Sequence, residues 1–206
     1  FEMGMLIHYS SNVTLVNNSA EMNEIVSETA SGGGGFDVYN SFNLTFINNT
    51  ISKNNATGVI LSSCGEIYFF NNTFEENGDE AIFVQDCSNL FFKENLIKDN
   101  GDGFFLSSSN NSVFRDNLIS GNDGYGIDFY ESNNCSSVGN LIVGNSKGLQ
   151  ISGGENNTIV NDSIHGNVNW DIRLKSAGHS NLFRNINFTA SRKISFYDTS
   201  SWFNYN

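Results

Sequence analysis

The sequence predicts an all-β fold: a single-stranded parallel β-helix of about eight rungs, with three short strands in each rung. Two observations support this, a repeat that runs along the whole chain and a strand-like alternation inside each repeat. An Asn marks the repeat, and after its second member the spacing is 23, 23, 22, 23, 22 and 23 residues. The members are Asn18, Asn49, Asn72, Asn95, Asn117, Asn140, Asp162 and Asn185. Such a fixed period is typical of stacked units that contact only their neighbours.

Each repeat contains three segments in which apolar side chains alternate with other residues. In one repeat, Ile67 and Phe69 precede the marker Asn, Phe74 follows it, and the run Ala81-Ile-Phe-Val completes the unit. A period of two indicates strands rather than a helix. Successive strands would stack roughly 4.8 Å apart. We therefore expect an aromatic column in the core, made of Phe46, Phe69, Phe92 and Phe114.

A second Asn follows the marker by five residues in nearly every repeat. This series contains Asn23, Asn54, Asn77, Asn100, Asn122, Asn145 and Asn167, and Ala190 breaks it. Asn is common in turns, where its amide bonds to nearby backbone. We expect both series to lie at the turns and to bond from one rung to the next.

Several strings of the repeat carry a family resemblance. Asn71-Asn-Thr-Phe-Glu-Glu-Asn77, Asn117-Leu-Ile-Ser-Gly-Asn122 and Asn140-Leu-Ile-Val-Gly-Asn145 are examples. The pattern resembles the repeat of NosD-like and related carbohydrate-binding and sugar-hydrolase surface proteins of the pectate-lyase-like superfamily. The resemblance covers essentially the whole chain and implies a right-handed β-helix. It does not imply one activity, because that superfamily includes lyases, hydrolases, epimerases and non-enzymes.

The composition indicates which binding partners and which cellular location to expect. The net charge of −12 and the pI of about 4.4 argue against nucleic acid as a partner. No apolar stretch approaches 18 residues, so we expect no membrane span. Eleven Asn-X-Ser/Thr sequons suit a secreted, glycosylated protein of the cell surface.

The repeat also defines the domain. Because it does not break, residues 1–206 are predicted to form one domain. Incomplete rungs at both ends indicate a segment of a longer chain. Residues 24–34, which end in a glycine run, exceed the usual turn length. We expect them to form an inserted loop, and loops on rigid scaffolds often carry function.

The outward face of the third strand is the candidate functional site. Aromatic rings alternate there with carboxylate, amide and basic side chains, which is what a sugar-binding groove requires. The candidate catalytic residues are Asp128, Tyr130, Glu131, Arg173, Lys175 and Asp86. The candidate substrate-binding residues are Tyr39, Phe83, Phe105, Gln150 and Tyr197. The alternative is a solvated face with chance pairs.

Two chemistries would use this face. A polysaccharide lyase or epimerase would bind a uronate carboxylate with Arg173 or Lys175, and Tyr130 or Lys175 would act as the base. An inverting glycoside hydrolase needs two carboxylates about 6.5–9.5 Å apart. Asp86 and Glu131, two rungs apart, come near that range.

No cofactor is indicated, apart from Ca²⁺ at an acidic turn. Asp79 and Asp102 are expected to stack at one turn position, and carboxylate oxygens are ligands for Ca²⁺. The residues Cys64 and Cys87, 23 apart, occupy the same position on adjacent rungs. Their spacing allows a disulfide, and two stacked buried thiols are the alternative.

The first strand is apolar on its outward side as well. An exposed apolar strip of this length usually marks an interface, either with another copy or with the rest of a longer chain. Its residues are Ile47, Phe70, Phe91, Val138, Val160 and Phe183.

Two functions remain open. The first is an extracellular cell-surface module that binds or organises polysaccharide without catalysis. The alternative is a lyase, epimerase or hydrolase that acts on acidic polysaccharide through the outward face of the third strand. The absence of an Asp-Pro-His-Asp signature from the sequence weakens the enzymatic alternative.

Overall fold

The computed structural model describes residues 3–24, 34–176, 179–188, 194–197 and 202–204, with side chains up to Ile194. These residues form three parallel β-sheets, and the described part of the chain contains no helix. The predicted loop at 24–34 lies outside the described residues except for its two end residues.

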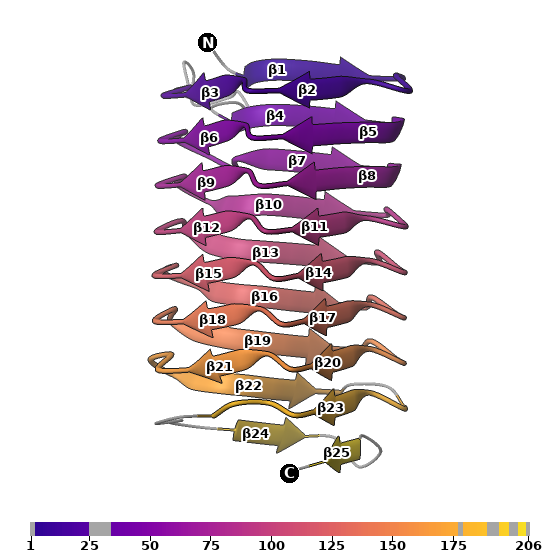
Figure 1. The fold of residues 1–206 in the computed structure, drawn as a ribbon, viewed down its shortest axis with the longest axis vertical. Helices are drawn as coiled ribbons and strands as arrows, with labels where there is room; N and C mark the ends of the chain where they lie inside the picture. The colour runs from indigo at the N-terminus through magenta and orange to yellow at the C-terminus, as the bar shows by residue number, and fades with distance from the viewer. Residues whose placement is uncertain (1–2, 25–33, 177–178, 189–193, 198–201, 205–206) are drawn as a thin grey trace.

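Each sheet collects one strand from successive rungs (Figure 1). Sheet A contains β1 (Met3–His8), β4 (Gly34–Tyr39), β7 (Val59–Ser62), β10 (Glu80–Gln85), β13 (Asp102–Ser107), β16 (Tyr125–Tyr130), β19 (Lys147–Ser152), β22 (Trp170–Lys175) and β24 (Ile194–Tyr197). Sheet B contains β2 (Thr14–Val16), β5 (Phe42–Ile47), β8 (Gly65–Phe70), β11 (Phe91–Lys93), β14 (Val113–Arg115), β17 (Ser136–Val138), β20 (Thr158–Val160), β23 (Leu182–Arg184) and β25 (Trp202–Asn204). Sheet C contains β3 (Ser19–Glu21), β6 (Thr50–Ser52), β9 (Thr73–Glu75), β12 (Leu96–Lys98), β15 (Leu118–Ser120), β18 (Leu141–Val143) and β21 (Ser163–His165).

The chain passes through sheets A, B and C in turn, so the fold is the predicted parallel β-helix. Among the described residues, seven rungs carry all three strands, and two further rungs carry sheet A and sheet B strands. The sequence predicts about eight rungs, so the predicted number differs only slightly from the observed number. In Figure 1, sheets B and C lie in front of sheet A, and the axis runs vertically.

The predicted aromatic column fills the core against sheet B. The ring centroids of Phe46 and Phe69 are 4.5 Å apart, those of Phe69 and Phe92 5.1 Å, and those of Phe92 and Phe114 4.9 Å. All four side chains are fully buried. Parallel pairing places equivalent residues side by side, which explains the stack.

The last repeat is one residue longer than predicted, and this corrects two expectations. Ile159 of β20 pairs with Phe183, a step of 24 residues. Phe183 therefore points into the core and is 1% exposed, instead of lying on the outward strip. Asn185 consequently leaves the buried series and donates to the side chain of Asn161 on the surface.

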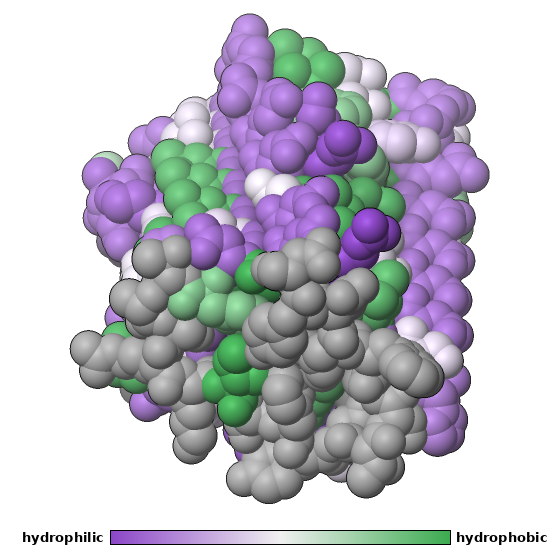
Figure 2. Space-filling view, turned by 60° about the horizontal axis from the view of Figure 1, so that its bottom comes forward, coloured by the Kyte–Doolittle hydropathy of each residue, from purple (hydrophilic) through white to green (hydrophobic). Residues whose placement is uncertain are grey.

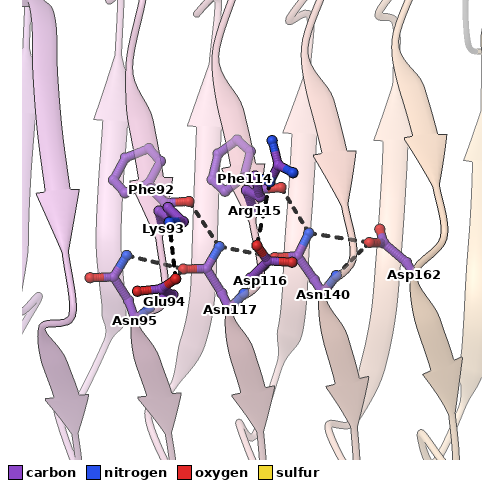
Figure 3. Close-up of polar contacts among 10 residues, drawn as sticks. All are labelled: Phe92, Lys93, Glu94, Asn95, Phe114, Arg115, Asp116, Asn117, Asn140 and Asp162. Atoms are coloured by element: carbon purple, nitrogen blue, oxygen red, sulfur yellow. Dashed lines mark hydrogen bonds and ion pairs between the residues drawn. The ribbon is translucent and has the colours of Figure 1, made fainter.

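Buried Asn ladders form the corner between sheets B and C and the corner between sheets C and A. Asn117 shows the pattern (Figure 3): its Nδ2 donates to the Phe92 carbonyl at 3.0 Å and to Asn140 Oδ1 at 2.9 Å. Its Oδ1 accepts from the backbone N–H of Asn95. The residue before each such Asn takes the left-handed conformation that turns the chain, as Asp116 does with φ 53°. Each ladder thus satisfies backbone groups that the turn would otherwise leave unpaired.

One ladder position differs from the rest. Asp162 is fully buried where the other rungs have Asn, and its Oδ1 accepts the Asn140 backbone N–H at 2.7 Å (Figure 3). Its Oδ2 accepts the Ser137 hydroxyl at 2.5 Å. Burial raises the pKa of Asp162 to about 7. Ser137 itself replaces a Phe of the core column, so the two exceptions lie in contact.

The corner between sheets A and B holds a third ladder that includes two cysteines. Cys64 and Cys87 are buried free thiols, so the stacked arrangement is found and the disulfide is not. The Cys64 N–H donates to Cys87 Sγ at 3.2 Å, and the Cys87 N–H donates to Ser109 Oγ at 3.0 Å. Ser109 in turn donates its N–H to Ser132 Oγ. The thiols therefore replace serine hydroxyls in one column.

The outward side of sheet B carries partly exposed apolar side chains. Ile47, Phe70, Phe91, Val138 and Val160 are each half-buried there. In the space-filling view, hydrophobic patches interrupt a largely hydrophilic surface (Figure 2).

Candidate functional site

A bend at the start of the sheet A strands directs an additional residue of each strand outward. In β16, Ile127 and Phe129 point into the core, and Asp128 points out. Strict alternation would also turn Gly126 outward, yet a Cβ on Gly126 would lie 2.7 Å from Cγ2 of the core residue Ile142. Two consecutive positions therefore face the interior, as in a bulge. Tyr125 lies on the outer face as a result.

The same bend recurs in the next two rungs and aligns two outward columns. Tyr125 pairs with Lys147, which pairs with Trp170. Asp128 pairs with Gln150, which pairs with Arg173. We call these six residues the Asp128 cluster.

A buried carboxylate lies at the centre of this cluster. Asp128 is 4% exposed although its strand position faces outward. Gln150 Nε2 donates to both of its oxygens, at 3.2 and 3.0 Å. Burial raises the pKa of Asp128 to about 6, and the nearby charge of Asp102 adds to this, while Gln150, Lys147 and Lys175 act in the opposite direction. Asp128 therefore changes protonation state close to neutral pH.

Aromatic rings and cations surround the carboxylate. Lys147 Nζ lies 4.2 Å from the ring centroid of Tyr125 and 5.8 Å from that of Trp170. The guanidinium carbon of Arg173 lies 4.9 Å from the Trp170 ring centroid. Burial, followed by the charge of Asp128, raises the pKa of the Tyr125 phenol, while Gln150 and Arg173 lower it. These contacts combine anion-binding groups with flat apolar surfaces.

An aromatic strip continues from the Asp128 cluster toward the N-terminal rungs. Phe83 and Phe105 stack with centroids 5.6 Å apart, and Phe105 stacks on Tyr130 at 6.4 Å. Beyond Phe83 lies a groove that includes Tyr39, Gln85 and Asp86. His8 Nε2 and Asp37 Oδ2 are 3.1 Å apart at its edge.

The predicted site residues separate into two groups. Asp128, Gln150 and Arg173 meet in the cluster, Lys175 lies near Asp128, and Phe83, Phe105 and Tyr130 form the strip. Asp86 and Glu131 are exposed residues of the corner between sheets A and B, separated by Ser108, so they do not join the cluster. Tyr197 pairs with Lys175 through its backbone, and its side chain lies outside the described residues.

The sequence matches a known protein family. Residues 4–142 match a family described as "Right handed beta helix region". The chain belongs to this right-handed β-helix family. The handedness implied by the resemblance is therefore that of the family. No curated protein matches the sequence.

Solved structures of other right-handed β-helices share the fold at low sequence identity. The A-module of the Azotobacter vinelandii mannuronan C-5 epimerase AlgE6 has a TM-score of 0.74 and 19% identity, covering 93% of this chain and 58% of that one. For the AlgE4 A-module of the same organism, the values are 0.73, 14%, 94% and 64%. The enzymatically active domain of bacteriophage CBA120 tailspike protein 2 gives 0.71, 10%, 98% and 39%. The chain thus spans less than two thirds of the length of these structures.

The acidic turn of this β-helix differs from the prediction. Asp102 pairs with Glu80 instead of stacking on Asp79, because its rung is one residue shorter at this turn. The Asp102 carboxylate accepts the backbone N–H of Tyr125. Burial raises the pKa of Asp102. Within the described residues, no group of three or more His, Cys, Asp or Glu side chains is arranged to hold a metal ion.

Sequence reasoning missed Tyr125, Lys147 and Trp170. It assumed strict alternation along the third strand, which places these residues on the inner side. The signal was the small residue that follows Tyr125 and Lys147, Gly126 and Gly148 respectively. A Cβ on Gly148 would lie 2.1 Å from the Asp171 carbonyl oxygen, so only glycine fits the bend there.

In the part of the chain that the structure describes, no helix is long and apolar enough to cross a membrane.

Proposed function

We propose that this β-helix binds an acidic polysaccharide along the outward face of sheet A. The observation that carries the proposal is the position of Lys147 and Arg173 beside aromatic rings, with Lys175 near Asp128, in a chain of net charge −12. Six of the ten Lys and Arg residues fall between Lys147 and Lys193. Cations on a strongly acidic protein would select the negative groups of a ligand locally.

The length of the face favours a polymer, instead of a small molecule, as the ligand. A chain lying parallel to the helix axis would pass from the Asp128 cluster over Phe105 and Phe83 to the groove at Tyr39. Aromatic faces suit sugar rings, and the polar side chains between them suit hydroxyl groups. The structures similar in fold include a mannuronan epimerase and a pectate lyase. Mannuronan and pectate are therefore the first ligands to test.

Binding should depend on the protonation of Asp128. Its pKa of about 6 means that it is mostly ionised at pH 7 and mostly protonated at pH 5. Protonation removes a negative charge beside the bound polyanion, while sugar carboxylates remain ionised at pH 5. We expect tighter binding at pH 5 than at pH 7. Asp128→Asn should bind as tightly at pH 7 as the wild type does at pH 5.

Titration calorimetry with mannuronate and galacturonate oligomers tests the proposal, and a neutral glucan oligomer serves as the negative ligand. Lys147→Met should weaken binding of the uronates. Lys93→Met, which removes a lysine from the outward side of sheet B, should not. Equal affinity for the neutral and acidic oligomers, or equal effects of the two substitutions, would contradict the proposal.

A second candidate function is proton transfer at the bound uronate, as in a lyase or epimerase. The buried Asp128, which titrates near neutral pH, and the adjacent Tyr125 phenol favour it. A base that removes the proton next to the sugar carboxylate leaves a carbanion that cations stabilise. Expulsion of the neighbouring glycosidic oxygen then gives an unsaturated sugar, and reprotonation gives an epimer.

Mass spectrometry of oligouronates incubated in D₂O distinguishes catalysis from binding. An epimerase would add deuterium at carbon without shortening the polymer, and a lyase would produce unsaturated fragments. Either signal should disappear in Asp128→Asn. Unchanged, undeuterated oligomers that still bind would identify a binding module without this chemistry.

We also propose that the protein works outside the cytoplasm or at the cell surface. The eleven sequons and the external location of most polysaccharides support this. One structurally similar protein is described as a periplasmic alginate epimerase. Glycopeptide mass spectrometry of the protein from its native source would test this setting, because occupied sequons require export.

A further inference from the structure

Two buried polar atoms in the Asp128 cluster lack hydrogen-bond partners. They are Gln150 Oε1, an acceptor, and Trp170 Nε1, a donor, and neither makes a hydrogen bond to the described residues. Gln150 is 5% exposed. Leaving such groups unpaired is costly, so native structures rarely do so without a reason. Both atoms lie on the outward face of adjacent strands, β19 and β22.

The orientation of the Gln150 amide is fixed by its neighbour. Its Nε2 donates to both oxygens of Asp128, at 3.2 and 3.0 Å. Turning the amide over would place its acceptor oxygen against the carboxylate and lose both bonds. The amide therefore keeps this orientation, with Oε1 directed away from Asp128, while Asp128 is ionised.

Two cationic side chains rest on the ring that carries the unpaired donor. Arg173 lies 4.9 Å and Lys147 5.8 Å from the Trp170 ring centroid. Contacts of a cation with an aromatic face are weaker than charge-assisted hydrogen bonds to a carboxylate. A ligand carboxylate would therefore compete with the ring for these cations.

We propose that Gln150 and Trp170 form a subsite that binds a sugar hydroxyl group. This subsite opens when Lys147 and Arg173 bind the carboxylate of the same ligand. The hydroxyl would donate to Gln150 Oε1 and accept from Trp170 Nε1. The ligand class is an acidic sugar with a free hydroxyl group near its carboxylate. This inference rests on the proposed function, because it assigns specificity within the same binding face.

Binding of a mannuronate hexamer and of the same hexamer with its hydroxyls acetylated tests the subsite. The wild type should bind the free hexamer at least about tenfold more tightly, because acetylation leaves both protein groups unpaired. Trp170→Phe keeps an aromatic ring and removes the N–H donor. It should weaken binding of the free hexamer about tenfold and leave the acetylated hexamer nearly unchanged.

Three outcomes overturn the inference in distinguishable ways. Equal weakening of both hexamers in Trp170→Phe would mean that the ring packs but reads no hydroxyl. No preference for the free hexamer in the wild type would remove the subsite and leave the proposed function standing. Binding of neither hexamer would overturn the proposed function together with this inference.

Fluorescence gives an independent readout that does not require the Trp170 variant to fold. Trp170 and Trp202 are the two tryptophans, so Trp202→Phe isolates the emission of Trp170. Saturating free hexamer should shift this emission, because the cations leave the ring and the N–H gains a partner. An unchanged spectrum at a concentration that calorimetry shows to be saturating would contradict the opening step.

Discussion

The corners of the β-helix and the outward face of sheet A differ in how completely their polar side chains are hydrogen-bonded. At the corners, Asn72, Asn95 and Asn117 repeat one residue type, and each amide bonds to the rungs on both sides. On sheet A, the corresponding positions change from Phe105 to Asp128 to Gln150, and Gln150 keeps an unpaired oxygen. Repetition with full pairing indicates a structural role, whereas variation with unpaired groups indicates a place for a ligand.

The largest expected loss of stability follows substitution of an Asn in the corner ladders. Asn117→Ala removes a side-chain partner from the Phe92 carbonyl and from two N–H groups of Asn95, while the Asn140 amide oxygen keeps the bond from the backbone N–H of residue 117. At about 1 kcal/mol or more for each of the three buried groups, we expect a loss of about 3 kcal/mol in the free energy of unfolding. Urea denaturation measures this. Asn55→Ala, at an exposed turn residue, is the control and should change stability by less than about 0.5 kcal/mol.

The next effect concerns Asp162, which places a carboxyl in the ladder between sheets B and C. Asp162 has a pKa of about 7 in the folded protein, whereas an unfolded Asp titrates near 3.9. The folded state therefore favours the protonated acid. The contribution of Asp162 to stability should be most favourable below pH 4, fall as pH rises to 7 and then level off.

Asp162→Asn tests this directly, because it restores the ladder residue and removes the titration. Relative to the wild type, the variant should gain about 4 kcal/mol more stability at pH 8 than at pH 4. Denaturant midpoints at both pH values give the comparison. Parallel stability curves for the two proteins would show that Asp162 does not titrate as its burial implies. Asp128 contributes equally to both curves and so cancels.

A smaller effect is expected on the outward face. Lys147→Met keeps most of the aliphatic stem over Tyr125 and removes the charge. We expect affinity for a uronate oligomer to fall about tenfold at low salt, with little loss of stability. The difference between variant and wild type should shrink as salt is added. A loss that is independent of salt would point to packing instead of charge.

The smallest effect returns to the corners. Cys64→Ser should change the free energy of unfolding by less than about 1 kcal/mol, because serine occupies the same column in other rungs. Thermal unfolding measures the shift. Reducing agent should leave the melting temperature of the wild type unchanged, since both thiols are free. A large reductant effect would instead reveal a cross-link.

The sequence predicted the fold well because the repeat constrains it at every level. Period, alternation and turn residues all point to the same rung, so the Phe46–Phe114 column and both Asn ladders were predictable. The prediction failed where one residue was added or lost. The added residue before Phe183 shifted its strand by one position and reversed its facing. The shorter turn before Asp102 broke the expected pairing with Asp79.

The candidate site was predictable only in part. Asp128, Gln150 and Arg173 follow the regular alternation, so their shared face could be read from the sequence. Tyr125 and Lys147 depend on the bend at Gly126 and Gly148, and Trp170 on the same bend at Asp171, which is visible only once the backbone is placed. The burial of Asp128 and the unpaired atoms of Gln150 and Trp170 depend on three-dimensional packing, which no local pattern encodes.

The contrast between corners and sheet A is tested most directly by NMR. Backbone amide shifts would be followed while a mannuronate hexamer is titrated into the protein. The largest shifts should lie on β16, β19 and β22 around Asp128, Gln150 and Arg173, while the ladder amides of Asn95 and Asn117 stay in place. Shifts confined to sheet B or sheet C, or binding with no change on sheet A, would contradict this assignment.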